Sequence, residues 1–510
     1  MHLTKQKVSD LMKGKYKIFY VATEIQPFAG TSDFAEVAGL FPKALKNIGH
    51  DIRVMMPNYR SVNARRYVLR DVIRLKDMPV SAGDFKATVN AKSAFLPDSK
   101  VQIYFLDNPE YFARLGLFHD PQTGEEFADN IERMTVFALG CLKTLQTLHW
   151  QPNVIHCNGW RTAMLPILIK TQFADDPFFN QPKIVFTPEN FSDWGVYDRD
   201  VLEKAGLPAD IFRNEFLLDD GKKFSFLKAA LATSDRVVAP GKHYLHDSGK
   251  ASEWAAELKK VSDVDDQEQV GIISGIDYQA WDPETDSFLE ENYTLRSVGK
   301  KTGNKKVLIE ALKVPFEVDK PLAVVWLSEN AEKELSLLEQ SVDELRSLDM
   351  QILIVSDSAE GAVLEYAASL ANNYSDTFFG VTDPDEETLH KLNAACDFSL
   401  IMAEAPIVNQ RKFQLVSMRY GTIPIVQSMN GHADAVVEYD DEHETGTGFL
   451  FRNADRESFI QALNRAAQVY KDSKKWVRLV KNAMKENFSI ETTGAVYTRL
   501  YADLLNNSKG

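Results

Sequence analysis

The sequence has few cysteines and lacks the short motifs that mark common cofactor or metal sites. Its three cysteines, at 141, 157 and 396, share no spacing typical of metal ligands, and they fit a reducing cytoplasm in which we expect small buried thiols. There is no Walker-type loop and no Gly-x-Ser-x-Gly elbow. Residues 198–200, Asp-Arg-Asp, resemble the acidic motif of metal-dependent transferases, but such pairs arise by chance in an acidic chain. We expect no metal and no other cofactor.

The sequence also lacks long apolar runs and an excess of basic residues. No stretch approaches the ~20 apolar residues of a membrane span, and residues 1–15 lack the apolar centre of a signal peptide. The 73 acidic residues outnumber the 58 basic ones, which gives a net charge of −15. This sign argues against nucleic-acid and anionic-membrane partners, because both need a basic surface. We expect a cytoplasmic protein.

What the sequence does contain is a regular alternation of β-prone and helical stretches. Strands are expected at 17–23, 51–56, 101–106, 154–156, 183–187, 236–239, 322–327, 351–356, 377–381, 398–402 and 423–426. Helices are expected at 34–48 (with Gly49 as its C-cap), 130–148, 224–232, 332–348, 360–370, 386–395, 412–419 and 457–470. Repeated strand–helix–strand units imply parallel sheets covered on both faces.

The length of the chain favours at least two such α/β domains. The polar, acidic stretch at 263–268 suits a surface connection, so we place the boundary near residue 270. The predicted domains are 1–270 and 271–485, followed by a C-terminal helical segment at 486–510. In doubly wound sheets ligands bind at the carboxyl ends of the strands, so a cleft between the domains is the expected site.

Ordered motifs from residue 17 to about 505 carry a family resemblance. They include Ala-Thr-Glu-Ile-Gln-Pro-Phe-Ala (22–29), Tyr-Phe-Leu-Asp-Asn-Pro-Glu-Tyr-Phe (104–112), Ser-Phe-Leu-Lys-Ala (225–229), Gly-Ile-Asp-Tyr (275–278), Met-Arg-Tyr-Gly-Thr-Ile-Pro (418–424) and Thr-Gly-Phe-Leu-Phe (447–451). The chain thus resembles bacterial glycogen synthases and plant starch synthases. The resemblance implies a GT-B fold, with two Rossmann-like domains facing a central cleft and a last helix that returns to the N-terminal domain. The implied reaction is retaining transfer of glucose from ADP-glucose to an α-1,4-glucan.

In the N-terminal half, positions that serve the chemistry of this family hold other residues. The family's Lys-Thr-Gly-Gly-Leu loop, which meets the donor phosphates, reads Gly-Thr-Ser-Asp-Phe at 30–34, so Gly30 replaces the lysine. Ser32 or Asp33 is better explained as the N-cap of the following helix. Asn158 replaces the histidine of the family's His-Asp-Trp stretch. An asparagine can still hydrogen-bond a sugar hydroxyl, but it has no titratable proton. The family's Ile-His-Asn has likewise lost its histidine before Asn190.

In the C-terminal half the losses are electrostatic. The family's arginine and lysine at the leaving diphosphate are replaced by Leu327 and Glu332, and its sugar-binding glutamate by Val408. Glu404 could substitute for that glutamate only if the loop were rearranged. Losing one such donor typically costs ~10²–10³ in rate. Arg411 and Lys412 add positive charge near the start of the helix expected at 412–419. They therefore remain candidates for an anion-binding site.

Several positions remain that could contact a glucan. By the resemblance these are Thr31, Asp129, Asn158, Trp160 and Asn190. For Asp129 the alternative is a helix-capping carboxylate, and Trp194 could stack on glucose but is better explained by packing.

Two further polar side chains near these positions have mainly structural explanations. His156 is best explained as a structural histidine whose ring is hydrogen-bonded within the fold. Arg161 could supply a cation to the site, but a side chain exposed to solvent is the favoured explanation.

The sequence therefore favours a relative that binds α-glucan and has no intact catalytic set. A nucleotide sugar and a partner protein are further candidate ligands. The alternative is an active glycogen or starch synthase with a rebuilt site. A third hypothesis is a transferase for another donor, in which Arg161, Arg411 and Lys412 would meet its phosphates.

Overall fold

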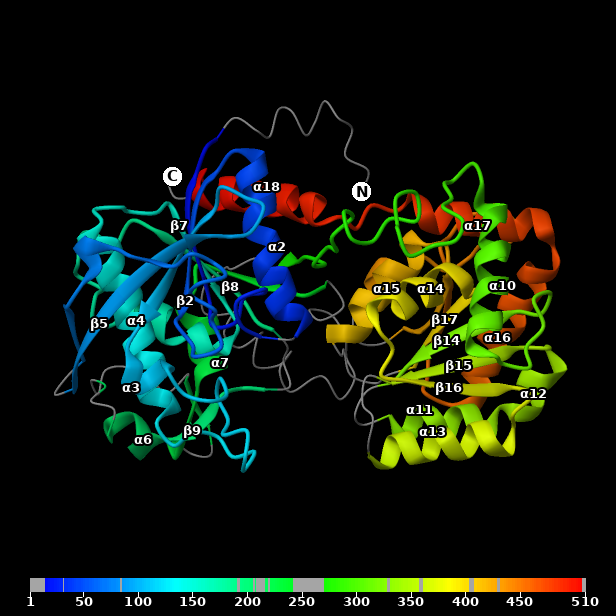
Figure 1. Ribbon diagram of the computed structural model, residues 1–510. Helices are drawn as coiled ribbons and strands as arrows, with labels where there is room; N and C mark the ends of the chain where they lie inside the picture. Colours follow the sequence, from blue (N-terminus) through cyan, green and yellow to red (C-terminus); the bar gives the residue numbers. More distant parts are fainter. Residues whose placement is uncertain are drawn as a thin grey trace. The chain divides into compact units, whose positions relative to one another are not determined.

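The protein forms two compact units in the computed structural model, shown in Figure 1. The structure describes residues 14–30, 32–82, 85–189, 193–204, 207, 216–218, 221–241, 270–327, 331–356, 361–402, 408–428 and 432–506, without the side chains of 33, 201, 204 and 408–411. Unit 1 comprises Met1–Ser274 and Ile490–Gly510, and unit 2 comprises Gly275–Ser489.

Unit 1 is built on a twisted, mostly parallel sheet with the order β13-β12-β8-β7-β1-β2-β6-β5-β3. The parallel strands are β1 (Lys17–Ala22), β2 (Asp51–Pro57), β6 (Gln102–Asp107), β7 (Val154–Asn158), β8 (Lys183–Thr187), β12 (Arg236–Ala239) and β13 (Val270–Gly271). Beyond β6 the pairing turns antiparallel, with β3 (Arg70–Asp71), β4 (Met78–Ala82) and β5 (Phe85–Phe95). A small antiparallel sheet joins β9 (Val196–Asp198), β10 (Leu217–Leu218) and β11 (Lys223–Ser225).

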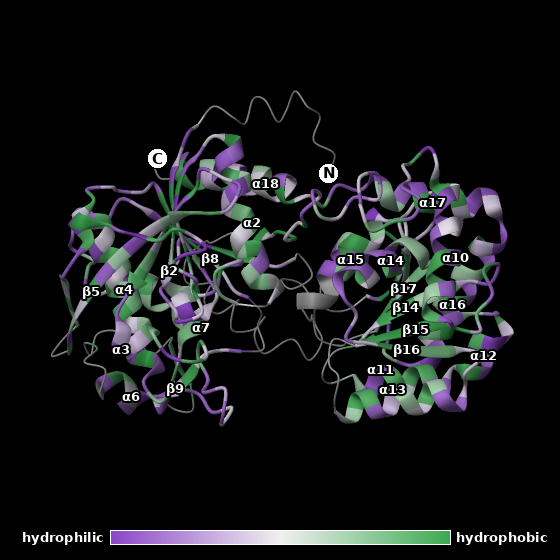
Figure 2. Ribbon diagram, viewed as in Figure 1, coloured by the Kyte–Doolittle hydropathy of each residue, from purple (hydrophilic) through white to green (hydrophobic). Residues whose placement is uncertain are grey.

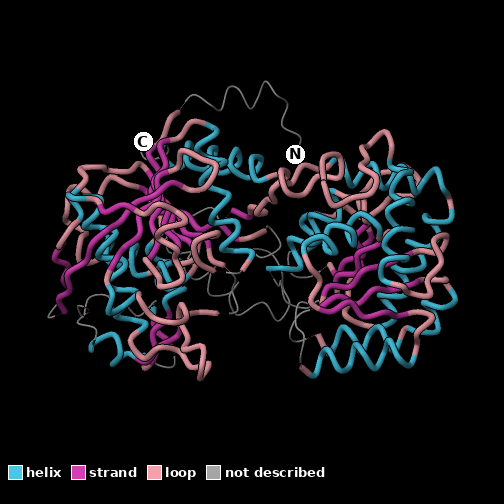
Figure 3. The backbone as a smooth tube through the Cα atoms, in the orientation of Figure 1, coloured by secondary structure: helices cyan, strands magenta, loops and turns pink. Residues whose placement is uncertain are grey.

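Helices flank the strands of unit 1, as the tube in Figure 3 shows. They are α2 (Asp33–Ile48), α3 (Pro109–Phe112), α4 (Asn130–Thr147), α5 (Met164–Lys170), α6 (Arg199–Lys204), α7 (Phe226–Thr233) and α18 (Ile490–Asn506), with 3₁₀ turns η1 (Ile73–Leu75) and η2 (Trp160–Thr162). The predicted caps of α2 are confirmed: the Ser32 hydroxyl accepts a hydrogen bond from the Ala35 amide, and Gly49 ends the helix in the left-handed conformation.

The last helix, α18, packs against α2 and completes the core of unit 1 (Figure 1). A Cβ on Gly494 would lie 3.3 Å from the Cβ of Ala44 on α2, so the glycine permits this close approach. Tyr501 on α18 shares a hydrogen bond of 2.7 Å with His156 in the middle of β7. The core of unit 1 is therefore closed by the end of the chain.

Unit 2 has a six-stranded parallel sheet with the order β16-β15-β14-β17-β18-β19. Its strands are β14 (Leu322–Trp326), β15 (Gln351–Ser356), β16 (Phe378–Thr382), β17 (Phe398–Ile401), β18 (Ile423–Gln427) and β19 (Phe449–Phe451). Its helices are α10 (Lys301–Leu312), α11 (Glu332–Gln340), α12 (Val342–Ser347), α13 (Ala362–Asn373), α14 (Glu386–Ala395), α15 (Val408–Arg419), α16 (Arg456–Lys471) and α17 (Ser473–Lys485), with 3₁₀ turns η6 (Val298–Lys300) and η7 (His432–Ala435). Figure 2 shows β14 to β16 as mainly hydrophobic, as expected for strands buried on both faces.

The predicted strand–helix alternation is confirmed in both units. The expected helix at 332–348 is wrong as a single element, because α11 ends at Gln340 and α12 begins at Val342. Between them the Ser341 hydroxyl donates to the Leu337 carbonyl, a bond that competes with regular helix geometry. The hairpin of β4 and β5, the helices α10 and α17, and the strand β19 were not predicted.

Candidate functional site

The carboxyl ends of β1, β7 and β8 form one edge of the unit 1 sheet, where this fold class binds its ligands. Strand register places Ala22 beside Asn158, and Asn158 beside Thr187. Glu24 and Glu189 each follow their strand by two residues, and Arg161 follows β7 by three. The two carboxyl groups therefore lie at the same edge as the guanidinium. Sequence reasoning did not include either glutamate, although the spacing from the strand ends could have indicated both.

Arg161 is held between aromatic rings, so the prediction that it is exposed to solvent was wrong. Its guanidinium carbon lies 4.2 Å from the ring centroid of Phe118 and 4.6 Å from that of Trp160. Only 15% of its side chain is exposed, and its Nη2 lies 3.9 Å from a carboxylate oxygen of Asp193. Trp160 is buried and donates its indole N–H to the same carboxylate, at 2.7 Å. The ring faces and Asp193 offset the cost of burying the charge.

Both glutamates at this edge hold their protons more tightly than usual. Burial raises the pKa of Glu24, while Arg161 acts in the opposite direction. Burial, together with the negative charges of Glu24 and Asp193, raises the pKa of Glu189 to about 7 against the pull of Arg161. By the resemblance, Glu189 stands where the family has a histidine. The edge thus keeps a group that exchanges a proton near neutral pH.

His156 is confirmed as a structural histidine. Its Nδ1 lies 2.7 Å from the Tyr501 hydroxyl and its Nε2 lies 2.9 Å from the Thr187 hydroxyl. Burial lowers the pKa of His156 to about 3, so the ring is neutral. Asn158 is also buried, and its amide nitrogen donates to the carbonyls of Val21 and His156. Both hydrogen bonds that its side chain makes within the described residues come from this nitrogen.

Asp129 forms a paired ion bridge instead of capping helix α4. Its carboxylate oxygens lie 2.7 Å and 2.5 Å from the two terminal nitrogens of Arg114. Although Asp129 occupies the N-cap position of α4, its side chain makes no capping hydrogen bond, so the alternative of a capping carboxylate was wrong. The Asp129–Arg114 pair is partly exposed and presents hydrogen-bonding groups to solvent.

The loop after β1 is closed around Gly30. This residue has a φ of +95°, and a Cβ there would lie 2.7 Å from the Cβ of Ala35 and 2.8 Å from Oε2 of Glu24. A carboxylate therefore lies against the backbone at the position where the family has a lysine. Any side chain at residue 30 would require the loop to move.

In unit 2, the residues that the structure describes at the end of β14 are apolar. Trp326 ends β14, and its ring stacks on Phe413 of α15 with 4.1 Å between ring centroids and 8° between planes. Leu327, at the position of the family's arginine, is buried, and its amide donates to the Val355 carbonyl. Glu332, at the position of the lysine, is exposed in the first turn of α11. A carboxylate at a helix N-terminus is favourable there without any ligand.

Some predicted site residues lie outside the described part of the chain. Thr31, Asn190 and Glu404 belong to this group, and the side chains of Val408 and Arg411 do as well. Lys412 is described, and its ammonium nitrogen lies 5.5 Å from the ring centroid of Trp281 in unit 2. The anion site at Arg411 and Lys412 stays a prediction.

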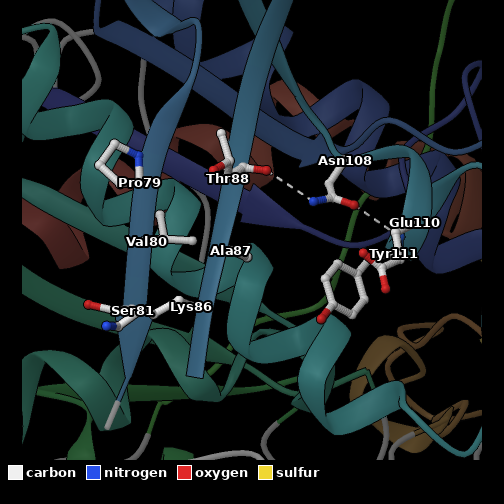
Figure 4. Close-up of a pocket in the computed structure, with 9 residues that line it drawn as sticks. All are labelled: Pro79, Val80, Ser81, Lys86, Ala87, Thr88, Asn108, Glu110 and Tyr111. Carbon is white, nitrogen blue, oxygen red and sulfur yellow. Dashed lines mark hydrogen bonds between the residues drawn. The ribbon is translucent and has the colours of Figure 1, made fainter. Parts of the chain in front are cut away.

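Unit 1 also contains a packed tryptophan and a groove. Trp194 packs against the hydrophobic core, which confirms the packing role expected for it. A groove of about 710 Å³ lies between the β4–β5 hairpin and α3 (Figure 4). In this groove the Asn108 side chain accepts a hydrogen bond from the Tyr111 amide and donates one to the Thr88 carbonyl. The amide group of Asn108 is therefore hydrogen-bonded within the protein.

Within the described ranges, no three His, Cys, Asp or Glu side chains come close enough to hold a metal ion. The three cysteines are buried, as predicted. None of the helices that the structure describes combines the length and apolarity needed to cross a membrane.

Comparison with known proteins decides the family. The chain is 32% identical to the glycogen synthase of Chlorobium limicola over 97% of its own length and 100% of the relative's. The chain belongs to the glycogen synthase family. This family member is also 32% identical to the glycogen synthase of Desulforudis audaxviator, over 96% of both chains. Residues 17–252 match the family model of the starch synthase catalytic domain.

The fold of this glycogen synthase relative is also known from a solved structure. The catalytic domain of starch synthase IV from Arabidopsis thaliana, bound to ADP and acarbose, superposes with a TM-score of 0.80 and 24% sequence identity. The match covers 97% of this chain and 100% of that domain. The predicted GT-B class, with parallel α/β units, is confirmed.

Proposed function

We propose that this glycogen synthase relative binds α-glucan at the sheet edge of unit 1 and does not transfer glucose. It would act in the cytoplasm as a glucan-binding or regulatory protein, without a metal or cofactor. The acceptor-side domain would span 1–270 with the segment 486–510, and the domain derived from the nucleotide-sugar site would span 271–485. The ADP and acarbose named for the starch synthase suggest which ligands to test.

The observation that carries the proposal is the closed loop at Gly30. The family's lysine there would need the space that Glu24 and Ala35 occupy. A carboxylate repels a diphosphate where the lysine would attract it. At the unit 2 edge, the stacked Trp326 and Phe413 and the buried Leu327 supply no cation in place of the family's arginine. Electrostatic stabilisation of the leaving diphosphate is usually the largest single contribution to such catalysis.

Glucan binding is supported by the polar groups that remain at the unit 1 edge. Asp129 with Arg114 offers acceptors and donors at the start of α4. Glu24 and Arg161 offer them at the sheet edge, where the Arg161 guanidinium lies over the Trp160 ring. Sugars are typically held by such a combination of aromatic faces and paired polar groups.

A direct assay tests both parts of the proposal. The purified full chain is incubated with ADP-glucose or UDP-glucose and a glycogen primer, and nucleotide release is measured beside the C. limicola glycogen synthase. We expect no release above the protein-free blank, together with retardation of the protein in a native gel that contains glycogen. Turnover near that of the control enzyme would establish the alternative, an active synthase with a rebuilt site.

A reciprocal change isolates the electrostatic argument. In an active enzyme of the family, replacing the arginine and the lysine that the resemblance implies at the leaving diphosphate by leucine and glutamate, the residues found here at 327 and 332, should lower the rate by more than ~10²-fold. A small change would mean that these positions do not decide activity. If the full chain shows neither turnover nor glycogen retardation, glucan binding is wrong and a protein ligand remains.

A further inference from the structure

The segment between β2 and β4 carries positive charge in an otherwise acidic protein. Residues 58–77 contain six basic side chains and two acidic ones, a net charge of 6 − 2 = +4. The rest of the chain therefore carries −15 − 4 = −19. All six basic residues are exposed. They are the five arginines Arg60, Arg65, Arg66, Arg70 and Arg74, and the lysine Lys76.

Most of these charges have no partner within the described residues. Within the ranges that the structure describes, Lys76 alone of the six forms an ion pair, with Asp71 at 3.2 Å, and Arg66 lies over the Tyr67 ring at 5.3 Å. The side chains of the other four arginines make no hydrogen bond or ion pair in the part of the chain that the structure describes. In a protein with 73 acidic residues, this clustering leaves guanidinium groups available for an external ligand.

Large apolar side chains are exposed in the same region. Ile73 is 86% exposed, Val68 59% and Phe95 61%. Strand β3 is the edge of the sheet, and Arg70 pairs with Ser93 of β5. Val68 precedes β3 by two residues, and Phe95 is the last residue of β5. Charged side chains protect a sheet edge from pairing with strands of other molecules, whereas exposed apolar side chains do not. Protection of the β3 edge therefore does not explain why both kinds of side chain are exposed there.

The segment is fixed to unit 1 by its buried residues. Leu75 and Val62 lie in the core, and the Tyr67 hydroxyl donates to the Pro27 carbonyl at 2.9 Å. The Tyr67 ring also meets Phe28 edge to face, with 4.6 Å between ring centroids. The exposed arginines therefore extend from an ordered support, which lowers the entropy cost of binding.

We propose that this arginine surface, formed by Arg60, Arg65, Arg66, Arg70, Arg74, Lys76, Val68, Ile73 and Phe95, docks an acidic segment of another protein. Such a segment would present carboxylates to the guanidinium groups and apolar side chains to Val68 and Phe95. Arginine suits carboxylates because its planar fork donates two parallel hydrogen bonds, and protein interfaces are enriched in arginine and aromatic residues.

The charge of the remaining chain favours a short protein segment over larger polyanions. A nucleic acid or an anionic membrane extends beyond the patch and meets the −19 charge of the rest of the molecule. Charges within about 10 Å of each other still interact at ordinary ionic strength. A short acidic segment can stay within the positive surface.

The test uses a fluorescent synthetic peptide of repeated Glu-Glu-Leu units and measures its binding to the full chain by anisotropy. We expect Arg65→Glu, Arg70→Glu and Arg74→Glu combined to weaken binding at least about tenfold. The matched control reverses three exposed lysines of unit 2, Lys306→Glu, Lys313→Glu and Lys471→Glu, and should bind like the unmodified chain. Equal affinity of the arginine variant and the unmodified chain would overturn the proposal.

Two further arms separate the ligand classes. Replacing Val68, Ile73 and Phe95 by serine should remove the preference for the Glu-Glu-Leu peptide over poly-glutamate. If single-stranded RNA or phosphatidylserine vesicles bind more tightly than the peptide, and lose binding in the arginine variant, the surface serves those ligands and the proposal is wrong. Glycogen retardation of the arginine variant is measured in parallel, so that loss of glucan binding is distinguished from loss of peptide binding.

Discussion

Residues at the family's site positions differ in chemical character between the two units. In unit 1, a carboxylate and a guanidinium are paired, as in Asp129 with Arg114 at the start of α4. In unit 2, the rings of Trp326 and Phe413 are stacked at the end of β14, beside the buried Leu327. Polar pairing therefore fixes the first set of described residues, whereas ring packing fixes the second.

Removing the aromatic stack should give the largest effect. Phe413→Ala deletes a buried ring packed on Trp326, and such truncations cost about 3–5 kcal/mol. The free energy of unfolding is measured by urea denaturation, and glycogen retardation should persist while unit 1 is folded. As the control, Phe95→Ala removes an exposed ring and should change stability by less than about 0.5 kcal/mol. Similar losses in both variants would mean that the stack is not a packing element.

Substitution at Gly30 tests the closed loop of unit 1. Gly30→Ala combines a left-handed backbone with contacts of 2.7–2.8 Å, so we expect a loss of about 2–4 kcal/mol in the free energy of unfolding. Gly124 also has a positive φ, but a Cβ there would meet nothing within 4 Å. Gly124→Ala should therefore cost only about 1–2 kcal/mol. Equal costs would show that Glu24 and Ala35 do not restrict the loop.

Glu189 should make the stability of unit 1 depend on pH. Its pKa is raised from 4.5 to about 7, so the folded state binds a proton that the unfolded state has released. The free energy of unfolding should therefore fall as pH rises from about 4.5 to about 7, by at most about 3 kcal/mol. Glu189→Gln should flatten this dependence and raise the thermal midpoint at pH 8 more than at pH 5. An unchanged pH profile would contradict the assignment.

The smallest expected effect concerns glucan affinity. Asp129→Asn removes one charge of the pair with Arg114 and should weaken glycogen retardation about tenfold, or about 1.4 kcal/mol. Unit 2 offers a matched pair, because Arg346 binds both carboxylate oxygens of Asp376 at 2.7 Å and 2.9 Å. Asp376→Asn should leave glycogen retardation unchanged. If both variants bind glycogen equally, the acceptor assignment of Asp129 fails.

Local patterns predicted the fold and part of the site. The strands at 183–187 and 351–356 match the structure because their apolar runs are short and bounded by polar residues. The Ser32 cap follows from its position next to a helix. The structural role of His156 is confirmed, although the strand continues past it to Asn158.

Features that depend on distant partners were not predictable from local patterns. Arg161 is largely covered because Phe118 and Asp193 lie against it, and neither lies near it in the sequence. The same holds for the raised pKa of Glu189, which depends on Glu24.

The placement of α18 has a consequence for synthesis on the ribosome. Unit 2 is a continuous segment and is complete once residue 489 has emerged, whereas unit 1 still lacks the helix that carries Tyr497 and Tyr501. Domains generally fold as they emerge, the first one first. In this protein unit 1 begins first and is completed last. The apolar core of unit 1 therefore stays exposed on the nascent chain until α18 is translated.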